Sequence, residues 1–203
     1  MDHKHIASTR RIEAFSDGVF AIIVTLLVLD LKVPDIVQNA SVQFSLTSLL
    51  HLLPQFISFA LSFVIVCIFW VNHHEFFSVI KAADHKFLWL NNLTLFWLCF
   101  VPFPTAFIGR NPTNVIAVML FGSVLFLAAL SFSLMISYVF SKKDLLDEHI
   151  SDTDRKIARK RGYLGVAAYA LSILLAPLSV YISLAIFILV PLYYFIPRRF
   201  AFA

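Results

Sequence analysis

Long apolar runs separated by short polar segments dominate the chain. The first four runs occupy residues 12–33, 46–71, 87–108 and 113–140. Each is long enough to cross the roughly 30 Å hydrocarbon core of a bilayer as a helix that rises about 1.5 Å per residue. A fifth run, 163–196, is too long for one crossing, and Pro177 near its middle predicts two shorter helices over 163–178 and 180–196. The pattern therefore predicts a single all-α domain over residues 1–203 with six transmembrane helices.

Positive charge is distributed unevenly between the connectors of this layout. Fourteen of the 16 Lys and Arg residues lie at the N-terminus, in the second and fourth connectors and at the C-terminus, whereas only Lys32 and Arg110 fall on the opposite side. Cytoplasmic segments collect Lys and Arg, so both termini are expected in the cytoplasm of a cell that carries the chain in its plasma membrane. The polar segment 141–162 mixes acidic and basic side chains and is predicted to be a solvated cytoplasmic connector, with room for some helix within it.

Composition supports a membrane class and excludes several others. The chain is 60% hydrophobic and 14% charged, whereas soluble domains have roughly 45–50% apolar and about 25% charged residues. The net charge of +4 does not indicate nucleic acid, because the basic residues lie between apolar runs rather than along one surface stripe. Cys67 and Cys99 both lie within apolar runs, where a thiol acts as a small hydrophobe.

Enzyme signatures are absent from the sequence. It contains no GxSxG, HExxH or P-loop pattern, and the five glycines do not form a phosphate-binding loop. His73 and His74 are adjacent, so on a helix they point about 100° apart and do not form a bidentate metal site. We therefore expect no catalytic residue, cofactor or metal site, and hydrogen bonds between helices as the role of this pair.

The first apolar run begins with ionisable and polar residues. Ionisable groups at membrane depth usually face the interior of a helix bundle and pair with polar groups there. At helical pitch Asp17 points away from the face that Gly18 and Ile22 share, so it is expected to face the bundle. The polar partners available at a similar or greater depth are Trp70, Asn72, His73, His74, Asn91 and Asn92. The alternative is that Ser16 and Asp17 only cap the helix N-terminus.

The opposite face of the same run is almost entirely apolar. It is formed by Gly18, Ile22, Leu26 and Leu29, with Thr25 beside it and Asp30 near the outer end. Such a stripe can face lipid, pack in a core or line a pore, and periodicity alone does not distinguish these roles.

Three sequence stretches carry a family resemblance. The motif RxxxFSD over residues 11–17, WVNHHEFF over 70–77 and NNLTLFWLCFVPFPTAFIGR over 91–110 resemble the lysosomal potassium channel family known as transmembrane protein 175, in its bacterial branch. The resemblance covers more than half of the chain, and the first motif is specific. The later helices are similar to the family only in number and hydrophobicity.

The resemblance implies a potassium channel built as a homotetramer of six-helix subunits, with the first helix lining a central pore. The narrow point would be Ile22, with further apolar layers at Leu26 and Leu29, and Thr25 would be tied to potassium preference. The permeant ion would be potassium rather than sodium, with protons as a possible second ion. The sequence lacks the TVGYG carbonyl filter of other potassium channels, so selection would depend on a hydrophobic constriction, with Asp30 attracting monovalent cations at the outer mouth.

In the family the motif residues are structural and join the first helix to its neighbours. The residues that match this role are Arg11, Phe15, Ser16, Asp17, Trp70, Asn72, His73 and His74. An alternative function for six helices with buried Asp, Asn and His is a small proton-coupled secondary transporter. Its usual repeated halves are not visible in this sequence. A scaffold or an intramembrane enzyme is the third alternative.

Overall fold

The chain folds into a bundle of long helices. The computed structural model describes residues 8–34, 41–147 and 150–195, which contain one isolated β-bridge between Ile80 and Leu146 but no strand. The prediction of an all-α chain is confirmed. The helices are α1 (Thr9–Leu27), η1 (Val28–Asp30), α2 (Val42–Leu50), α3 (Leu53–Phe77), α4 (His85–Cys99), α5 (Pro102–Arg110), α6 (Val115–Val139), η2 (Lys143–Leu145), α7 (Asp152–Leu175) and α8 (Val180–Phe195).

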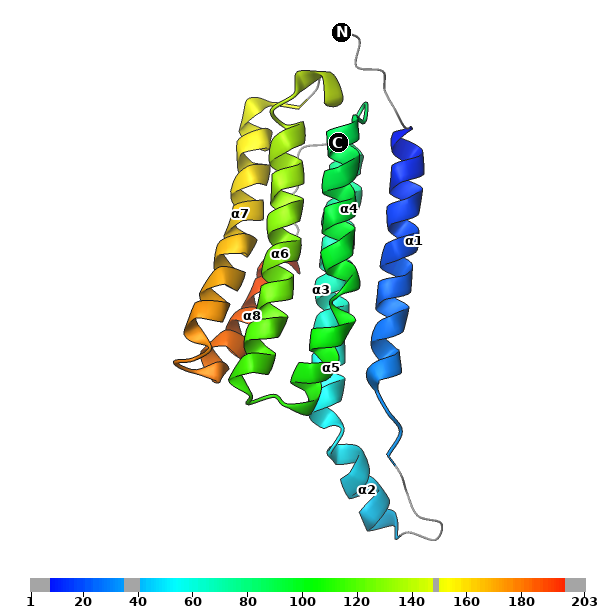
Figure 1. The fold of residues 1–203 in the computed structure, drawn as a ribbon, viewed down its shortest axis with the longest axis vertical. Helices are drawn as coiled ribbons and strands as arrows, with labels where there is room; N and C mark the ends of the chain where they lie inside the picture. Colours follow the sequence, from blue (N-terminus) through cyan, green and yellow to red (C-terminus); the bar gives the residue numbers. More distant parts are fainter. Residues whose placement is uncertain (1–7, 35–40, 148–149, 196–203) are drawn as a thin grey trace.

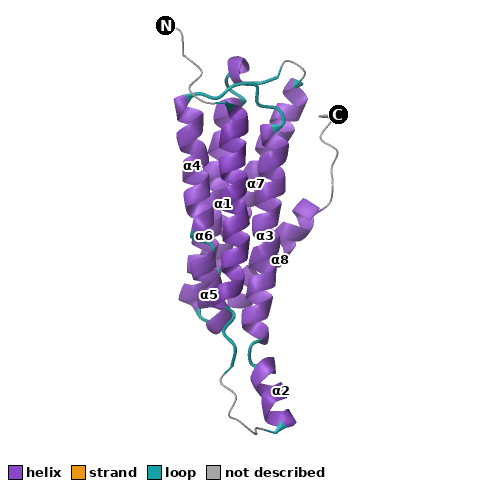
Figure 2. Cartoon of the chain, turned by 90° about the vertical axis from the view of Figure 1, so that its right-hand side faces the viewer, coloured by secondary structure: helices purple, strands orange, loops and turns teal. Residues whose placement is uncertain are grey.

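Successive long helices run in opposite directions and pack side by side (Figure 1). Helix α1 lies at one edge of the bundle and packs on α3 and α4, whereas α6 lies between α4 and α7. The short helix α2 projects beyond the end of the bundle in both ribbon views (Figure 2). Because α1 is an edge helix, one of its faces stays free of contacts within the chain.

The helix boundaries differ from the apolar runs where capping and proline residues act. The run 46–71 is divided into α2 and α3, and Pro54 lies in the first turn of α3, where a missing N–H carries no cost. The run 87–108 is likewise divided into α4 and α5 just before Pro102. Helix α7 begins inside the polar connector 141–162, because the hydroxyl of Ser151 accepts a hydrogen bond from the N–H of Asp154 at 3.1 Å.

The other boundaries lie close to the apolar runs. Helix α6 falls within 113–140, and the turn between α7 and α8 contains Pro177. Residue 196, at the end of the sixth run, lies outside the described residues, as do Lys4, Arg198 and Arg199 near the termini. Within the described residues, four helical segments are long and apolar enough to span a membrane: Thr9–Asp30, Leu53–Phe77, His85–Arg110 and Val115–Val139.

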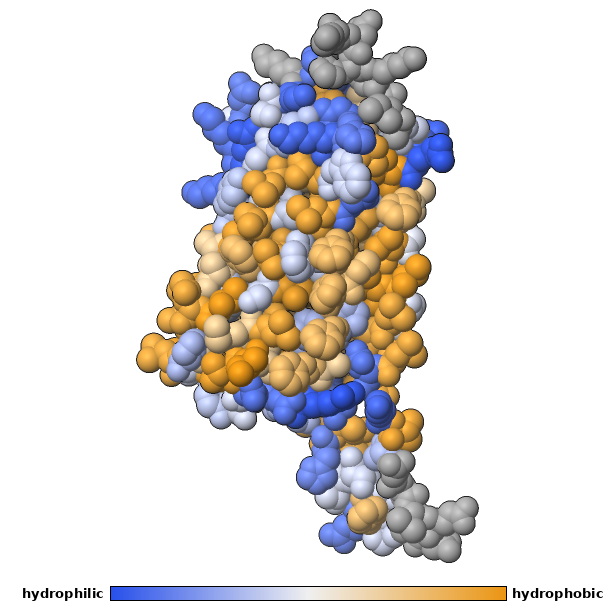
Figure 3. Space-filling model, viewed as in Figure 1, coloured by the Kyte–Doolittle hydropathy of each residue, from blue (hydrophilic) through white to orange (hydrophobic). Residues whose placement is uncertain are grey.

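The surface shows a broad apolar belt between two polar ends (Figure 3). The end where α1, α4 and α7 begin carries almost all of the described Lys and Arg residues, and we call it the basic end. Lys32 and Arg110 lie at the opposite end. Lys32 follows η1, and Arg110 is the last residue of α5. An apolar belt with basic residues gathered at one end is expected of a protein whose helices cross a bilayer.

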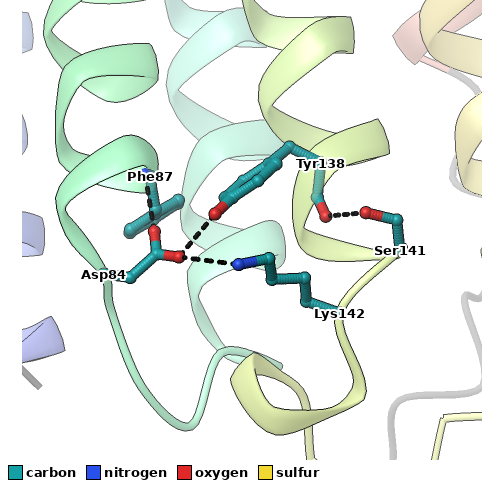
Figure 4. A network of polar contacts seen from close by, with 5 residues as sticks. All are labelled: Asp84, Phe87, Tyr138, Ser141 and Lys142. Atoms are coloured by element: carbon teal, nitrogen blue, oxygen red, sulfur yellow. Dashed lines mark hydrogen bonds and ion pairs between the residues drawn. The ribbon is translucent and has the colours of Figure 1, made fainter. Parts of the chain in front are cut away.

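Asp84 ties the start of α4 to the end of α6 at the basic end (Figure 4). Its Oδ1 accepts a hydrogen bond from the backbone N–H of Phe87 at 2.8 Å. Its Oδ2 accepts from the hydroxyl of Tyr138 at 2.5 Å and from the ammonium of Lys142 at 3.4 Å. Partial burial opposes the charged form, but these donors outweigh it and hold the pKa of Asp84 below its ordinary value.

Candidate functional site

Helix α1 has one packed face and one uncovered face. The packed face meets α3, α4 and α5. It carries the buried residues Ile12, Ser16, Phe20, Ile23 and Leu27. The uncovered face carries Gly18, Ile22, Thr25, Leu26 and Leu29, all of them exposed. We call these five residues the α1 stripe.

The α1 stripe is apolar and free of intramolecular contacts along most of its length. The exposed fraction is 59% for Ile22, 44% for Leu26 and 70% for Leu29. A Cβ atom added at Gly18 would meet no atom within 4 Å. The hydroxyl of Thr25 lies within hydrogen-bond distance of the carbonyl oxygens of Ala21, at 3.0 Å, and Ile22, at 2.9 Å. Its proton is therefore directed at its own helix, which leaves the oxygen lone pairs free.

Asp30 lies beside the outer end of the stripe rather than on it. Its side chain is half-buried and lines a small cavity of about 10 Å³ together with Gln55 and Thr105. A cavity of this size holds about one water molecule. The carboxylate makes no hydrogen bond or ion pair with another described residue, so it is available to solvent or to cations at this end of the molecule.

The packed face of α1 is held by a buried polar cluster. The amide nitrogen of Asn91 donates to the hydroxyl of Ser16 at 3.0 Å, and Ser16 donates in turn to the carbonyl oxygen of Ile12 at 2.9 Å. The carbonyl oxygen of Asn91 lies 2.9 Å from Nε2 of His73. Since that oxygen only accepts, His73 carries its proton on Nε2. The cluster joins α1, α3 and α4.

Two further contacts join α1 to α3, one on each side of the buried cluster along the helix axis. The indole N–H of Trp70 donates to a carboxylate oxygen of Asp17 at 2.9 Å. Nδ1 of His74 lies 3.3 Å from a carboxylate oxygen of Glu13. Together with the buried cluster, these contacts place polar links over the first half of α1, while the second half is held by apolar packing at Ile23 and Leu27.

Not every residue of the sequence motif takes part in these links. Arg11 and Phe15 are exposed, Phe15 to 60%, and they lie on the same side of α1 as Gly18 and Ile22. The guanidinium of Arg11 makes no hydrogen bond or ion pair with another described residue. The amide of Asn72 donates to the carbonyl oxygen of Ile68 in its own helix at 2.6 Å.

Two residues of the polar links were not among the predicted structural residues. Asn91 is the hub of the buried cluster, although the sequence marked it only as an available partner. Its neighbour Asn92 is exposed, so only the helical phase of α4 distinguishes the two. Glu13 was also missed, and its position four residues before Asp17 was the available signal. The described residues contain no group of three His, Cys, Asp or Glu residues that could hold a metal ion.

Comparisons with known proteins show which family the chain resembles. The family model described as endosomal/lysosomal potassium channel TMEM175 matches residues 11–102. A potassium channel of Chamaesiphon minutus is 34% identical over 93% of this chain and 94% of its own length. The human endosomal/lysosomal proton channel TMEM175 is 33% identical over 61% of this chain and 26% of its own length.

The fold is also similar to that of a solved relative. The crystal structure of a lysosomal potassium-selective channel TMEM175 homologue from Chamaesiphon minutus superposes with a TM-score of 0.79 at 34% identity, covering 92% of this chain and 95% of that one. The similarity covers nearly the whole chain, whereas the family model matches residues 11–102. The chain therefore belongs to the TMEM175 family of ion channels and is not an enzyme.

Proposed function

We propose that this chain is one subunit of a homotetrameric cation channel that conducts potassium in preference to sodium. The observation that carries the proposal is the α1 stripe, an apolar face left uncovered on a helix whose other face is fixed by polar contacts. Four copies of α1 that meet around an axis would cover the stripe and line a pore with it. The names of the bacterial relatives, which are potassium channels, support the same ion.

Six membrane crossings fit the proposed subunit. They are α1, α3, α4 with α5, α6, the apolar part of α7, and α8. Their even number leaves both termini on one side, and the basic end of the bundle indicates that this side is the cytoplasm of a plasma membrane. Lipid and monovalent cations are then the partners of the tetramer, and no cofactor is required.

A hydrophobic constriction at Ile22, with further layers at Leu26 and Leu29, is the proposed basis of selection. Apolar rings offer no ligand to an ion, so a tight ring excludes water, and a slightly wider ring passes a partly hydrated cation. Potassium holds its water less strongly than sodium, which favours potassium at such a ring. The free lone pairs of Thr25 would face the pore one turn away, and Asp30 would raise the local cation concentration at the outer mouth.

The motif residues then have two structural roles. Ser16 and Asp17 anchor α1 to the rest of its own subunit through Asn91, His73 and Trp70. Arg11 and Phe15 face the same direction as the stripe, so in the tetramer they would contact neighbouring subunits at the basic end. His74 adds its contact to Glu13, and Asn72 stabilises α3 internally.

Substitution of Ile22 by Asn tests the proposed constriction. A polar ring eases wetting, so the variant should conduct more and discriminate less between potassium and sodium in bi-ionic reversal potentials of reconstituted channels. The matched control is Val28→Asn, because Val28 is an exposed residue at the start of η1, directly after α1, and lies off the stripe. Unchanged conductance and selectivity in Ile22→Asn would remove this residue from the constriction. A subunit mass without a tetramer in detergent would contradict the assembly.

The way in which potassium flux depends on a proton gradient distinguishes the channel from a proton-coupled transporter. Animal relatives are named proton channels, and we include protons among the permeant ions. A proton-coupled transporter is the second candidate, because His73 and Asn91 form a buried polar cluster between helices. Saturable potassium flux that a proton gradient drives in liposomes would support the transporter, whereas electrodiffusive current without saturation supports the channel.

A further inference from the structure

A partly open cavity of about 90 Å³ lies between α3, α6, α7 and α8, on the other side of α3 from α1. Its walls are mainly apolar and include Phe69, Phe132 and Val190. On α7 the lining extends from Ala158 to Tyr169, eleven residues along the helix, which is about 16 Å at helical rise. The cavity is therefore a slot that runs parallel to the helices over about half the thickness of a bilayer.

The slot is polar at one end and apolar at the other. Glu75, Ser133 and Arg161 line the part nearer the basic end, whereas the opposite part is formed by residues such as Ile65 and Ala129. The guanidinium of Arg161 lies over the ring of Tyr194, with 5.5 Å to the ring centroid. This polarity follows that of one lipid leaflet, with headgroups at the membrane surface and chains toward the middle.

One buried polar atom in the slot has no partner in the described structure. The side chain of Ser133 is 3% exposed, and its hydroxyl makes no hydrogen bond with any described residue. A buried hydroxyl without a partner is costly, and such groups are normally satisfied by a bound molecule or water. By contrast, the nearby Ser131 is also buried but donates to the carbonyl oxygen of Ala128 at 2.9 Å.

We propose that the slot binds one phospholipid per subunit, taken from the leaflet at the basic end. The part of one acyl chain nearest the ester would enter the cavity between its apolar walls, and the rest of the chain would lie against the outside of the bundle. An ester oxygen would accept the hydrogen bond of Ser133, and the phosphate would lie next to Arg161. Because Glu75 lines the same end, the polar part carries one positive and one negative side chain. The site therefore recognises the phosphate and the chain, with little preference for the net charge of the headgroup.

Native mass spectrometry of the delipidated full-length protein, titrated separately with phosphatidylethanolamine and phosphatidylglycerol, tests this site. We expect one tightly bound lipid per subunit and affinities for the two lipids within a few-fold. Ser133→Ala removes a hydroxyl that has no protein partner, so folding should be unaffected, while affinity for both lipids should fall by roughly three- to tenfold. The matched control Ser131→Ala should retain the affinity of the unmodified protein.

A second variant fills the slot instead of changing its polarity. Ala158→Phe places a ring at the partly buried α7 wall and should abolish the tightly bound lipid. Equal lipid binding by Ser133→Ala, Ala158→Phe and the unmodified protein would overturn the proposal. A strong preference for phosphatidylglycerol would also overturn the proposal, because such a preference would show that the basic surface of α7, rather than the slot, binds the lipid.

Discussion

The indole N–H of Trp70 on α3 donates a 2.9 Å hydrogen bond to the carboxylate of Asp17 on α1. A hydrogen bond to an ionised acceptor is stronger than one between neutral groups, and this one lies in the half of α1 nearer the basic end. It links an edge helix to the body of the subunit next to Ser16, in the half of α1 that carries the polar contacts. We infer that the pair positions α1 rather than contacting ions.

Replacement of Trp70 by Phe tests this inference. The ring remains but the donor is lost, so we expect a loss of about 1 kcal/mol of stability and a lower tetramer yield by size-exclusion chromatography. Asp17→Asn should act in the same direction, because it removes the charge. Trp89→Phe is the control, since the indole of Trp89 donates only to His85 in its own helix. Normal assembly with an altered reversal potential in Asp17→Asn would contradict a positioning role.

The two adjacent asparagines of α4 offer a matched test of the buried cluster. Asn91→Ala leaves the buried groups of Ser16 and His73 without their partner, and we expect a loss of roughly 2–4 kcal/mol of stability. Asn92→Ala changes an exposed side chain and should have little effect. Thermal unfolding in detergent measures both. Equal midpoints for the two variants would show that the cluster does not stabilise the fold.

Substitution of Thr25 tests whether its hydroxyl contributes to the preference for potassium over sodium. Thr25→Ala removes the hydroxyl from an exposed position, so the potassium-to-sodium permeability ratio should fall while the unfolding temperature stays unchanged. Thr25→Ser keeps the hydroxyl and should keep the ratio. Bi-ionic reversal potentials provide the measurement. An unchanged ratio in Thr25→Ala would show that selection depends on the apolar residues of the stripe alone.

The pKa of Asp84 predicts a pH dependence of stability. Its folded-state pKa lies below the unfolded value of about 3.9, so the carboxylate stabilises the fold at neutral pH, and this contribution is lost as pH falls from about 4 through the folded pKa. Asp84→Asn should therefore lower stability by roughly 1 kcal/mol at pH 7, and the difference should shrink below pH 4.

A control accompanies the Asp84 variant. Asp144 is an exposed acid in η2 near the same end, and Asp144→Asn should change the unfolding temperature little at either pH. The unfolding temperatures of Asp84→Asn and the unmodified protein should converge at low pH. If their difference stays constant down to pH 3, the assigned role of the charge is contradicted.

The sequence predicted the helical class and the long helices better than their ends. Apolar length alone located the cores of α1, α3 and α6, because hydrocarbon requires continuous apolar helix. It joined α2 to α3 and α4 to α5, since those breaks depend on proline and local capping rather than on hydropathy. It did not say where in the connector 141–162 helix begins, because the start of α7 depends on the capping residue Ser151 within a charged segment.

The two faces of α1 were separated correctly by helical phase, and the candidate partners of the polar face included Trp70, His73 and Asn91, but the sequence did not say which of the two asparagines takes part. Periodicity directs Asp17 away from Ile22, and that follows from geometry alone. The choice of Asn91 over Asn92 depends on the rotation of α4 about its axis, which tertiary packing decides. Likewise, the sequence gives no indication that the hydroxyl of Ser133 lacks a partner, because that depends on how closely α6 and α7 approach.

An apolar stripe on an edge helix has a particular meaning inside a bilayer. Surrounded by acyl chains, Ile22, Leu26 and Leu29 gain almost nothing by leaving lipid, since the hydrophobic effect provides no drive where water is absent. A solitary subunit could thus diffuse in the membrane without penalty. Cohesion between copies must then come from close van der Waals fit and from groups at the aqueous boundary, which makes quaternary structure responsive to the lipid composition around it.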